Sequence, residues 1–440
     1  MPSFIKRFVP AGSAVLTATA FGSYGLGLLR DRIFAQTFGL SVDLDAYNAA
    51  FLLPDFLFNL LVASGIAAAM VPLFSALKRE GYAQAYEYVG SIINTALITT
   101  GVVAAGLMVL AGPASHLVAP GLAETDQQAV VRLMRVLSLS PLLFSLSNSL
   151  GAMLVAERRF LYYGLSPMLY NLGIIAGVLA LAPRFGVMGA ALGTLGGASL
   201  HAGIRLFDAR RLGWRWHWVL GWKTPSFRKT IRLMLPKMIG HPVELVTFWA
   251  YTALASTRPA GSISALNFAR NFQSVPVSLI GITMSTAAFP LLADAIAGQR
   301  TSDFVSVLRR ILGSILVISA AAAVVLYLIR EPLIALLLGG GSFDAEAIKR
   351  TAQVLGIFCL AIPTESINHL LARAFYARHN TVVPVVFSML ALLVAVSVAW
   401  IFLPSVGITA LPAGFFAGSL IKTLGLTGWL YGQSLKSADD

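Results

Sequence analysis

Two sets of acidic and histidine residues have the types and spacing that could move protons. Glu365 and His369 lie four residues apart, and His241 and Glu244 lie three apart, so each set would share one helical face. A carboxylate beside an imidazole can relay a proton across a membrane. The residues also fit a structural role, in which the first pair joins neighbouring helices and the second set, with Lys237, neutralises itself. Both interpretations remain open from the sequence.

Arginine, aspartate and asparagine side chains in apolar stretches are the other candidates for a functional site. An ionisable group inside a membrane costs at least a few kcal/mol unless it is paired or faces water. Arg30 lies near a helix end, where it could instead reach the lipid headgroups or pair with Asp31. Arg270 lies well inside its stretch, which favours a role facing a central cavity. The full set is Arg30, Asp31, Asp45, Asn59, Arg270 and Asn271.

Enzymatic chemistry has no support in the sequence. It contains no P-loop, GxSxG or HExxH motif, and its six histidines and single cysteine do not form a metal-binding pattern. The run from Gly339 to Gly341 follows a helix end without a preceding strand, so it predicts an external loop rather than a phosphate-binding turn. We therefore expect a protein that is not an enzyme and needs no cofactor or metal.

The composition indicates which elements must position these residues. Hydrophobic residues make up 57% of the 440, charged residues only 12%, and the mean hydropathy is +0.78. A water-soluble chain needs about a quarter charged residues, so the sequence predicts a polytopic membrane protein. About twelve apolar stretches are long enough to span a bilayer, and only an all-α fold satisfies their backbone in lipid. These stretches lie near 11–36, 46–76, 86–112, 130–156, 160–182, 187–207, 230–256, 263–293, 307–329, 350–376, 381–403 and 408–433.

The net charge of +13 comes from basic residues between the spans. Lys and Arg are more numerous on the side of the N-terminus, which predicts cytoplasmic termini and argues against a nucleic-acid partner. The richest connector, 209–229 with the residues beside it, interleaves basic side chains with tryptophans and predicts a segment lying on the cytoplasmic leaflet. Its residues include Arg205, Arg210, Arg211, Arg215, Lys223, Arg228, Lys229, Trp214, Trp216, Trp218 and Trp222.

This connector divides the sequence into two halves with matching sequence features. Pro54 followed by Ala68–Leu73 in the second span matches Pro276 followed by Ala287–Leu291 in the eighth, and further proline and glycine matches follow in the same order. Six helices return the chain to the same side, so the repeat is parallel. We predict an N-lobe over 1–208, a linker over 209–229 and a C-lobe over 230–440, as in alternating-access transporters.

Several stretches resemble the MurJ (MviN) family of lipid II flippases, within the multidrug/oligosaccharidyl-lipid/polysaccharide exporter superfamily. The most specific is Leu371–Val385, at the junction of the tenth and eleventh spans. Leu26–Asp31, Pro167–Ile175 and Arg232–Pro236 resemble the first, fifth and seventh helices of the family. The resemblance covers roughly residues 12–430.

The resemblance implies a protein that moves an undecaprenyl-diphosphate-linked cell-wall precursor across the bacterial inner membrane by rocking two lobes around a cationic cavity. A lipid diphosphate cannot cross hydrocarbon unaided, and arginines can replace its lost hydration with charge-assisted hydrogen bonds. The resemblance places Arg30, Asp45 and Arg270 among the cavity charges. It also implies a monomer that could act beside peptidoglycan synthases.

The sequence departs from the family at several charged positions. Tyr24 and the pair Phe58–Asn59 stand where members carry arginine, and Tyr251 stands at the acidic position associated with sodium. The helix 8 arginine of the family aligns with Asn271, one residue after Arg270. Coupling to protons through Glu244, or through Glu365 with His369, is therefore the alternative to sodium.

These departures keep other functions open. Fewer arginines bind a diphosphate less strongly, so the substrate could be another polyprenyl-linked glycan. Loss of arginines also favours a non-transporting scaffold that keeps the fold, whereas the retained Arg30 and Arg270 argue against it. A cationic-drug exporter would need acidic rather than basic cavity groups.

Overall fold

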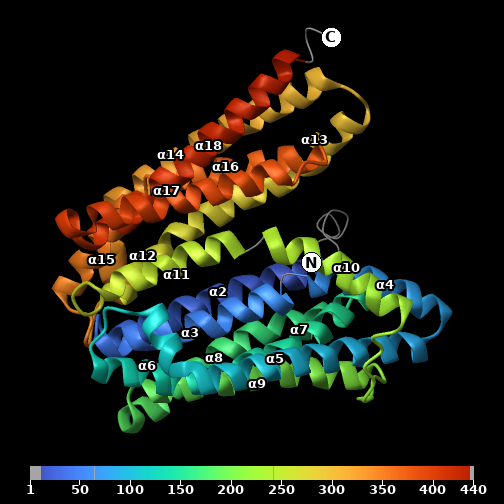
Figure 1. Cartoon of the computed structure of the whole chain (residues 1–440), viewed down its shortest axis with the longest axis horizontal. Helices are drawn as coiled ribbons and strands as arrows, with labels where there is room; N and C mark the ends of the chain where they lie inside the picture. The colour runs from blue at the N-terminus through green and yellow to red at the C-terminus, as the bar shows by residue number, and fades with distance from the viewer. Residues whose placement is uncertain (1–10, 64, 241, 437–440) are drawn as a thin grey trace. The chain divides into compact units, whose positions relative to one another are not determined.

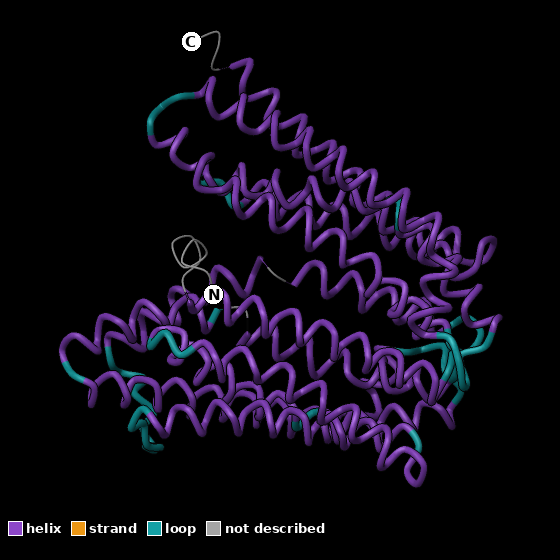
Figure 2. The backbone as a smooth tube through the Cα atoms, turned by 180° about the vertical axis from the view of Figure 1, so that it is seen from behind, coloured by secondary structure: helices purple, strands orange, loops and turns teal. Residues whose placement is uncertain are grey.

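The computed structural model describes residues 11–63, 65–240 and 242–436, and within them the regular elements are helices. Figure 2 shows this as a tube that is helical over most of its length, with short loops between helices. An isolated bridge between Gly340 and Phe343 closes one turn. The all-α fold expected from the apolar stretches is confirmed.

The chain divides into two compact units, Met1–Pro242 and Val243–Asp440. The first unit contains long helices that run side by side (Figure 1). Its elements are α2 (Ala11–Phe38), α3 (Val42–Phe58), the π-helical turn η1 (Asn59–Ala63), α4 (Ile66–Glu80), α5 (Tyr82–Val118), α6 (Glu124–Leu137), α7 (Ser140–Ala156), α8 (Phe160–Phe185), α9 (Val187–Arg211) and α10 (Pro225–Gly240).

The second unit has a similar order of elements, with a 3₁₀ turn added before its last helix and, within its described residues, no helix that corresponds to α10. Its elements are α11 (Pro242–Ser256), α12 (Ser262–Pro276), the π-helical turn η2 (Val277–Ile282), α13 (Thr283–Ala297), α14 (Thr301–Leu338), α15 (Ala345–Phe358), α16 (Ala361–Ala377), α17 (Val382–Val406), the 3₁₀ turn η3 (Gly407–Thr409) and α18 (Ala410–Lys436).

The packing within each unit bears out the internal repeat. In the first unit α8 packs along α9, and α7 packs against α5 and α9; in the second, α17 packs along α18, and α16 against α14 and α18. A π turn interrupts the matching helix of each unit, at η1 and at η2. Pro54 lies one turn before η1 and Pro276 lies directly before η2. Because proline lacks an N–H, it removes a helical hydrogen bond and favours such a break.

Small residues let the helices of the first unit approach closely. A Cβ atom at Gly177 would lie 2.3 Å from the Cα of Gly193, and one at Gly173 would lie 2.3 Å from the Cα of Gly197. Close backbone contact of this kind is how helices associate in lipid, where apolar side chains gain little from leaving the solvent. The α8–α9 pair is therefore held by close van der Waals packing of the two helix backbones.

Seven helical stretches of the described residues are long and apolar enough to cross a membrane, or up to eight if the bent pair α15 and α16 forms one span. One of the seven, Val382–Gly432, contains α17 and most of α18. The remaining predicted spans correspond to α2, to α3 with α4, and to α10 with α11. All of them carry charged side chains, and all but α2 contain proline. The chain is a multi-pass membrane protein.

The predicted lobe limits, with a linker over 209–229 and a C-lobe from 230, stay a prediction. In the described residues α10 packs on α4 and α5 of the first unit, and the division into compact units falls after Pro242. The segment between α9 and α10 lies on α5, where the Asn94 amide donates to the carbonyls of His217 and Val219 at 2.8 and 3.0 Å. Trp216, Trp218 and Trp222 remain exposed, whereas Trp214 is buried.

Candidate functional site

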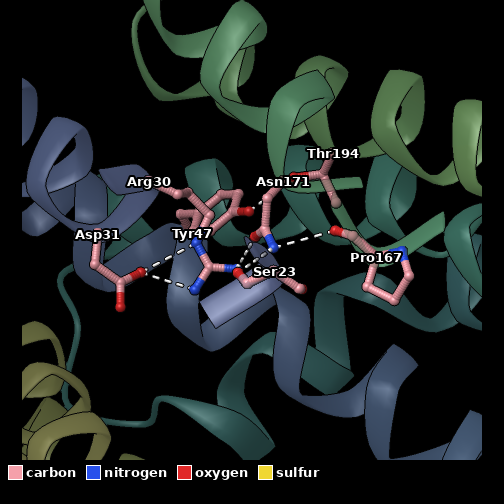
Figure 3. A network of polar contacts seen from close by, with 7 residues as sticks. All are labelled: Ser23, Arg30, Asp31, Tyr47, Pro167, Asn171 and Thr194. Atoms are coloured by element: carbon pink, nitrogen blue, oxygen red, sulfur yellow. Dashed lines mark hydrogen bonds and ion pairs between the residues drawn. The ribbon is translucent and has the colours of Figure 1, made fainter. Parts of the chain in front are cut away.

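The charged centre of the first unit is Arg30, which α2 presents at its contact with α8. Its Nε and Nη2 donate to Oδ1 of Asp31 at 3.0 and 2.8 Å, and its Nη1 donates to Oδ1 of Asn171 at 3.0 Å (Figure 3). The Arg30 side chain is 28% exposed and that of Asp31 is 19% exposed. A guanidinium has five N–H groups, so this arrangement fixes its plane and leaves donors for an anion.

Asn171 is held in turn by backbone oxygens, which decides how its amide is oriented. Its Nδ2 donates to the carbonyl of Pro167 at 3.1 Å and to that of Ser23 at 3.4 Å (Figure 3). With the NH₂ group turned toward these carbonyls, the amide oxygen faces Arg30. Asn171 was not among the predicted site residues. Its only signal was its place in the Pro167–Ile175 stretch that resembles the family.

Asp45 and Tyr47 lie at the beginning of α3. Ser41 caps this helix by accepting a hydrogen bond from the Leu44 N–H at 3.3 Å, and the buried Asp45 lies in the first turn, where the helix dipole favours negative charge. The Tyr47 hydroxyl lies 2.8 Å from Oγ1 of Thr194 in α9 (Figure 3). The Tyr47 ring also packs on that of Phe34 in α2, with ring centroids 5.3 Å apart, so these contacts hold the start of α3 against α2 and α9.

Asn59 does not extend away from its helix. Its Nδ2 donates to the carbonyl of Asp55 at 2.9 Å, one turn earlier in the same segment, and the residue begins the π turn η1. This side chain therefore gives the Asp55 carbonyl, which lies in the distorted segment after Pro54, a hydrogen-bond donor.

The charged centre of the second unit joins α11 and α12. Nη2 of Arg270 donates to Oε1 of Glu244 at 3.0 Å, and the guanidinium carbon lies 3.3 Å from the centre of the Phe248 ring. The Arg270 side chain is 33% exposed and that of Glu244 is 63% exposed, so both can meet water or a ligand. Asn271 is exposed on the same helix. His241, the expected companion of Glu244, lies outside the described residues, as does the side chain of Lys237.

Helix α16 carries the other predicted pair on a half-buried face. Glu365 and His369 lie one turn apart and interact electrostatically, and Arg373 continues the face by donating to the His369 carbonyl at 3.2 Å and to Thr286 of α13 at 2.8 Å. Asn368, on the neighbouring face of the helix, donates to Ser419 of α18. The polar residues of α16 thus serve two different contacts.

Arg205 was grouped with the basic residues around the linker, but the structure places it elsewhere. It lies inside α9 and is only 4% exposed. Sequence position alone could not separate it from Arg210 and Arg211, which follow within two turns. No group of three or more metal-ligating side chains occurs among the residues that the structure describes.

Comparisons with known proteins agree with this architecture. A family model described as "Lipid II flippase MurJ" matches residues 34–438. The chain is 26% identical over 436 residues to a "Probable lipid II flippase MurJ" of Rhizobium meliloti (strain 1021), covering 96% of this chain and 79% of the relative. It is 24% identical over 432 residues to a "Lipid II flippase MurJ" of Burkholderia cenocepacia, covering 93% and 82%.

Solved structures show the same fold. A lipid II flippase MurJ in an inward closed conformation superposes with a TM-score of 0.82 at 22% identity, covering 95% of this chain and 88% of that one. An inward-facing multidrug resistance transporter of the MATE family superposes with a TM-score of 0.76 at 15% identity, covering 94% of each chain.

Proposed function

This chain belongs to the MurJ family of lipid II flippases, whose family model matches residues 34–438, and from this premise we propose how it handles its substrate. The chain translocates an undecaprenyl-diphosphate-linked cell-wall precursor, lipid II, from the cytoplasmic to the outer leaflet of the bacterial inner membrane. Alternating access of the two units moves the headgroup, and the prenyl tail stays in lipid. Membrane lipids are the other binding partners.

The observation that carries the assignment is the geometry of Arg30. A diphosphate needs donors that replace its hydration, and a guanidinium supplies them in a fixed plane. Asp31 and Asn171 hold three of the five N–H groups of Arg30 and so set the direction of the remaining donors. Arg270, which stacks on Phe248 and pairs with the exposed Glu244, supplies a second guanidinium within the other unit.

Binding can be tested by native mass spectrometry of the purified full chain. Lipid II and an unrelated undecaprenyl-diphosphate glycan compete for wild type, Arg30→Ala and Arg270→Ala, with Arg184→Ala as the matched control because Arg184 is exposed at the end of α8. We expect wild type and the control to retain lipid II selectively, and each of the other variants to lose about tenfold or more in affinity.

Other outcomes have defined meanings. Preference of the wild type for the unrelated glycan would assign the protein to export of another polyprenyl-linked polysaccharide. Binding of neither lipid would favour a scaffold that keeps the fold without transport.

Coupling through protons extends the proposal. Glu365 and His369 share one half-buried face of α16, and an acidic residue beside a neutral or charged imidazole can take up and release a proton as the units rearrange. Glu244 is the second acidic candidate because its partner Arg270 can exchange it for a substrate anion. Both termini lie in the cytoplasm in this scheme, and the protein works as a monomer beside peptidoglycan synthases.

A further inference from the structure

A cavity of about 370 Å³ lies in the first unit, at the contact between α2 and α8 with α9 behind it. Its size falls within the range of small-molecule sites. Apolar and aromatic groups form most of its lining, and one charged side chain reaches it. The lining includes Leu16, Ala20, Ser23, Tyr24, Pro167 and Arg205.

Arg205 is a buried cation that the surrounding helices do not neutralise. Its Nε donates to Oγ of Ser166 at 2.8 Å, and its Nη1 donates to the carbonyl of Ser147 at 3.0 Å and to Oδ1 of Asn148 at 3.3 Å. All of these acceptors are uncharged, and the ion pairs of the described residues do not include Arg205. A buried charge without a counterion is costly, so this site favours an anion.

Pro167 affects the hydrogen bonds around Arg205 through the carbonyl of Tyr163. Proline lacks an N–H, so the carbonyl of Tyr163 has no helical donor, and Ser166 Oγ donates to it at 2.8 Å. Nη2 of Arg205 reaches the same carbonyl only at 3.5 Å, and the guanidinium carbon lies 4.5 Å from the centre of the Tyr163 ring. Nη2 carries two N–H groups, so its hydrogen-bonding capacity is the least used of the three nitrogens.

We propose that this cavity binds the phosphate of a membrane glycerophospholipid, with Arg205 as the counterion. One guanidinium matches the single charge of a phosphodiester, whereas a diphosphate carries more charge than this site can neutralise. The acyl chains would lie against the exposed Phe21 and Tyr24 of α2, which are 67% and 71% exposed within a predicted span.

This lipid site is separate from Arg30, although the two share one helix contact. Seven residues of α2, about 10 Å along the helix axis, separate Ser23 from Arg30. The carbonyls of Ser23 and Pro167, which border the cavity, accept the hydrogen bonds that orient Asn171 toward Arg30. Lipid in the cavity would therefore support the wall of the Arg30 site, and its binding does not depend on the flippase assignment.

The test is native mass spectrometry of the full chain with dioleoylphosphatidylglycerol, and with dioleoylglycerol as the lipid that lacks phosphate. Ala20→Phe is designed to fill the cavity while Arg205 itself is not replaced. Ala18→Phe is the matched control because Ala18 is exposed on the same helix outside the lining. Arg205→Gln removes the charge. We expect wild type and Ala18→Phe to bind phosphatidylglycerol, and Ala20→Phe and Arg205→Gln to lose at least about tenfold in affinity.

Three results would overturn the proposal. Wild-type affinity in Ala20→Phe would place the lipid elsewhere, even if Arg205→Gln fails to fold. Equal binding of dioleoylglycerol would show an apolar pocket without anion recognition. Displacement of the lipid by inorganic phosphate, or by undecaprenyl diphosphate in preference to phosphatidylglycerol, would assign the cavity to free phosphate or to the transport path.

Discussion

The amide oxygen of Asn171 lies 3.0 Å from Nη1 of Arg30, across 141 residues of sequence and between two helices. The partner of Arg30 on its own helix is Asp31, so the guanidinium is held from both sides of the α2–α8 contact. This arrangement makes the orientation of the arginine a property of two helices together.

Replacing Asn171 should weaken binding of the lipid diphosphate without unfolding the protein. In Asn171→Ala, Arg30 loses one charge-assisted hydrogen bond, worth about 1.5–3 kcal/mol, and part of its fixed orientation. We expect roughly tenfold weaker lipid II binding in native mass spectrometry. Asn171→Asp should weaken binding further, because a second carboxylate would compete with the substrate for the guanidinium. Unchanged binding in both variants would remove Asn171 from the site.

Glu365 should give transport its pH dependence. If its carboxylate takes up a proton during the cycle, Glu365→Gln removes that step, and the rate of lipid II flipping in proteoliposomes becomes flat with pH. Glu346→Gln is the control, since Glu346 is exposed at the start of α15 in the same unit. A pH profile in Glu365→Gln that matches the wild type would contradict the proton-relay role.

The close approach of α8 and α9 predicts opposite effects for two neighbouring glycines. A Cβ at Gly193 would lie 2.6 Å from the Cα of Gly177, whereas one at Gly196 meets nothing within 4 Å. Gly193→Ala should destabilise the protein by about 1–3 kcal/mol through overpacking. Gly196→Ala should be neutral or stabilise it by up to about 1 kcal/mol, because alanine favours the helix. Thermal unfolding in detergent compares the two, and equal melting temperatures would show that the contact is looser.

The pair formed by Lys78 and Glu157 should stabilise the folded protein at neutral pH and lose this effect at strongly alkaline pH. Lys78 lies beyond the predicted span at the end of α4, and the hydrogen bond that its Nζ donates to Glu157, at 2.7 Å, raises the pKa of the ammonium. Because the folded pKa lies above the ordinary value of about 10.4, the contribution is complete below that value. It is lost as the pH rises through the folded pKa.

Stability curves can check this sign. The difference in unfolding free energy between wild type and Lys78→Met should be constant from neutral pH to about pH 9 and should shrink above about pH 10.5. Its size should stay below about 1 kcal/mol, because the Lys78 side chain is 33% exposed and water screens the pair. Arg79→Met, at the exposed neighbouring position, is the control. A difference that grows with pH would contradict the assignment.

The sequence indicated the fold class because it depends on local properties. A run of apolar residues long enough to cross a bilayer must form a helix there, whatever it packs against. The matching positions of Pro54 and Pro276 likewise indicated the repeat, and in the structure each proline is followed by a π turn, η1 or η2. The exact limits of the units depended on where α10 packs, which hydropathy does not encode.

The candidate site shows the same difference between what the sequence indicates and what the tertiary structure determines. Residue type alone marked Arg30 and Arg270 as candidates, since an arginine in an apolar stretch needs a partner or water. Only the tertiary structure decided their partners, Asn171 for the first and Glu244 for the second, because each contact joins two helices. The same reason separates Arg205 from its basic neighbours: the helices around α9 bury its charge, and burial arises only when helices distant in sequence pack together.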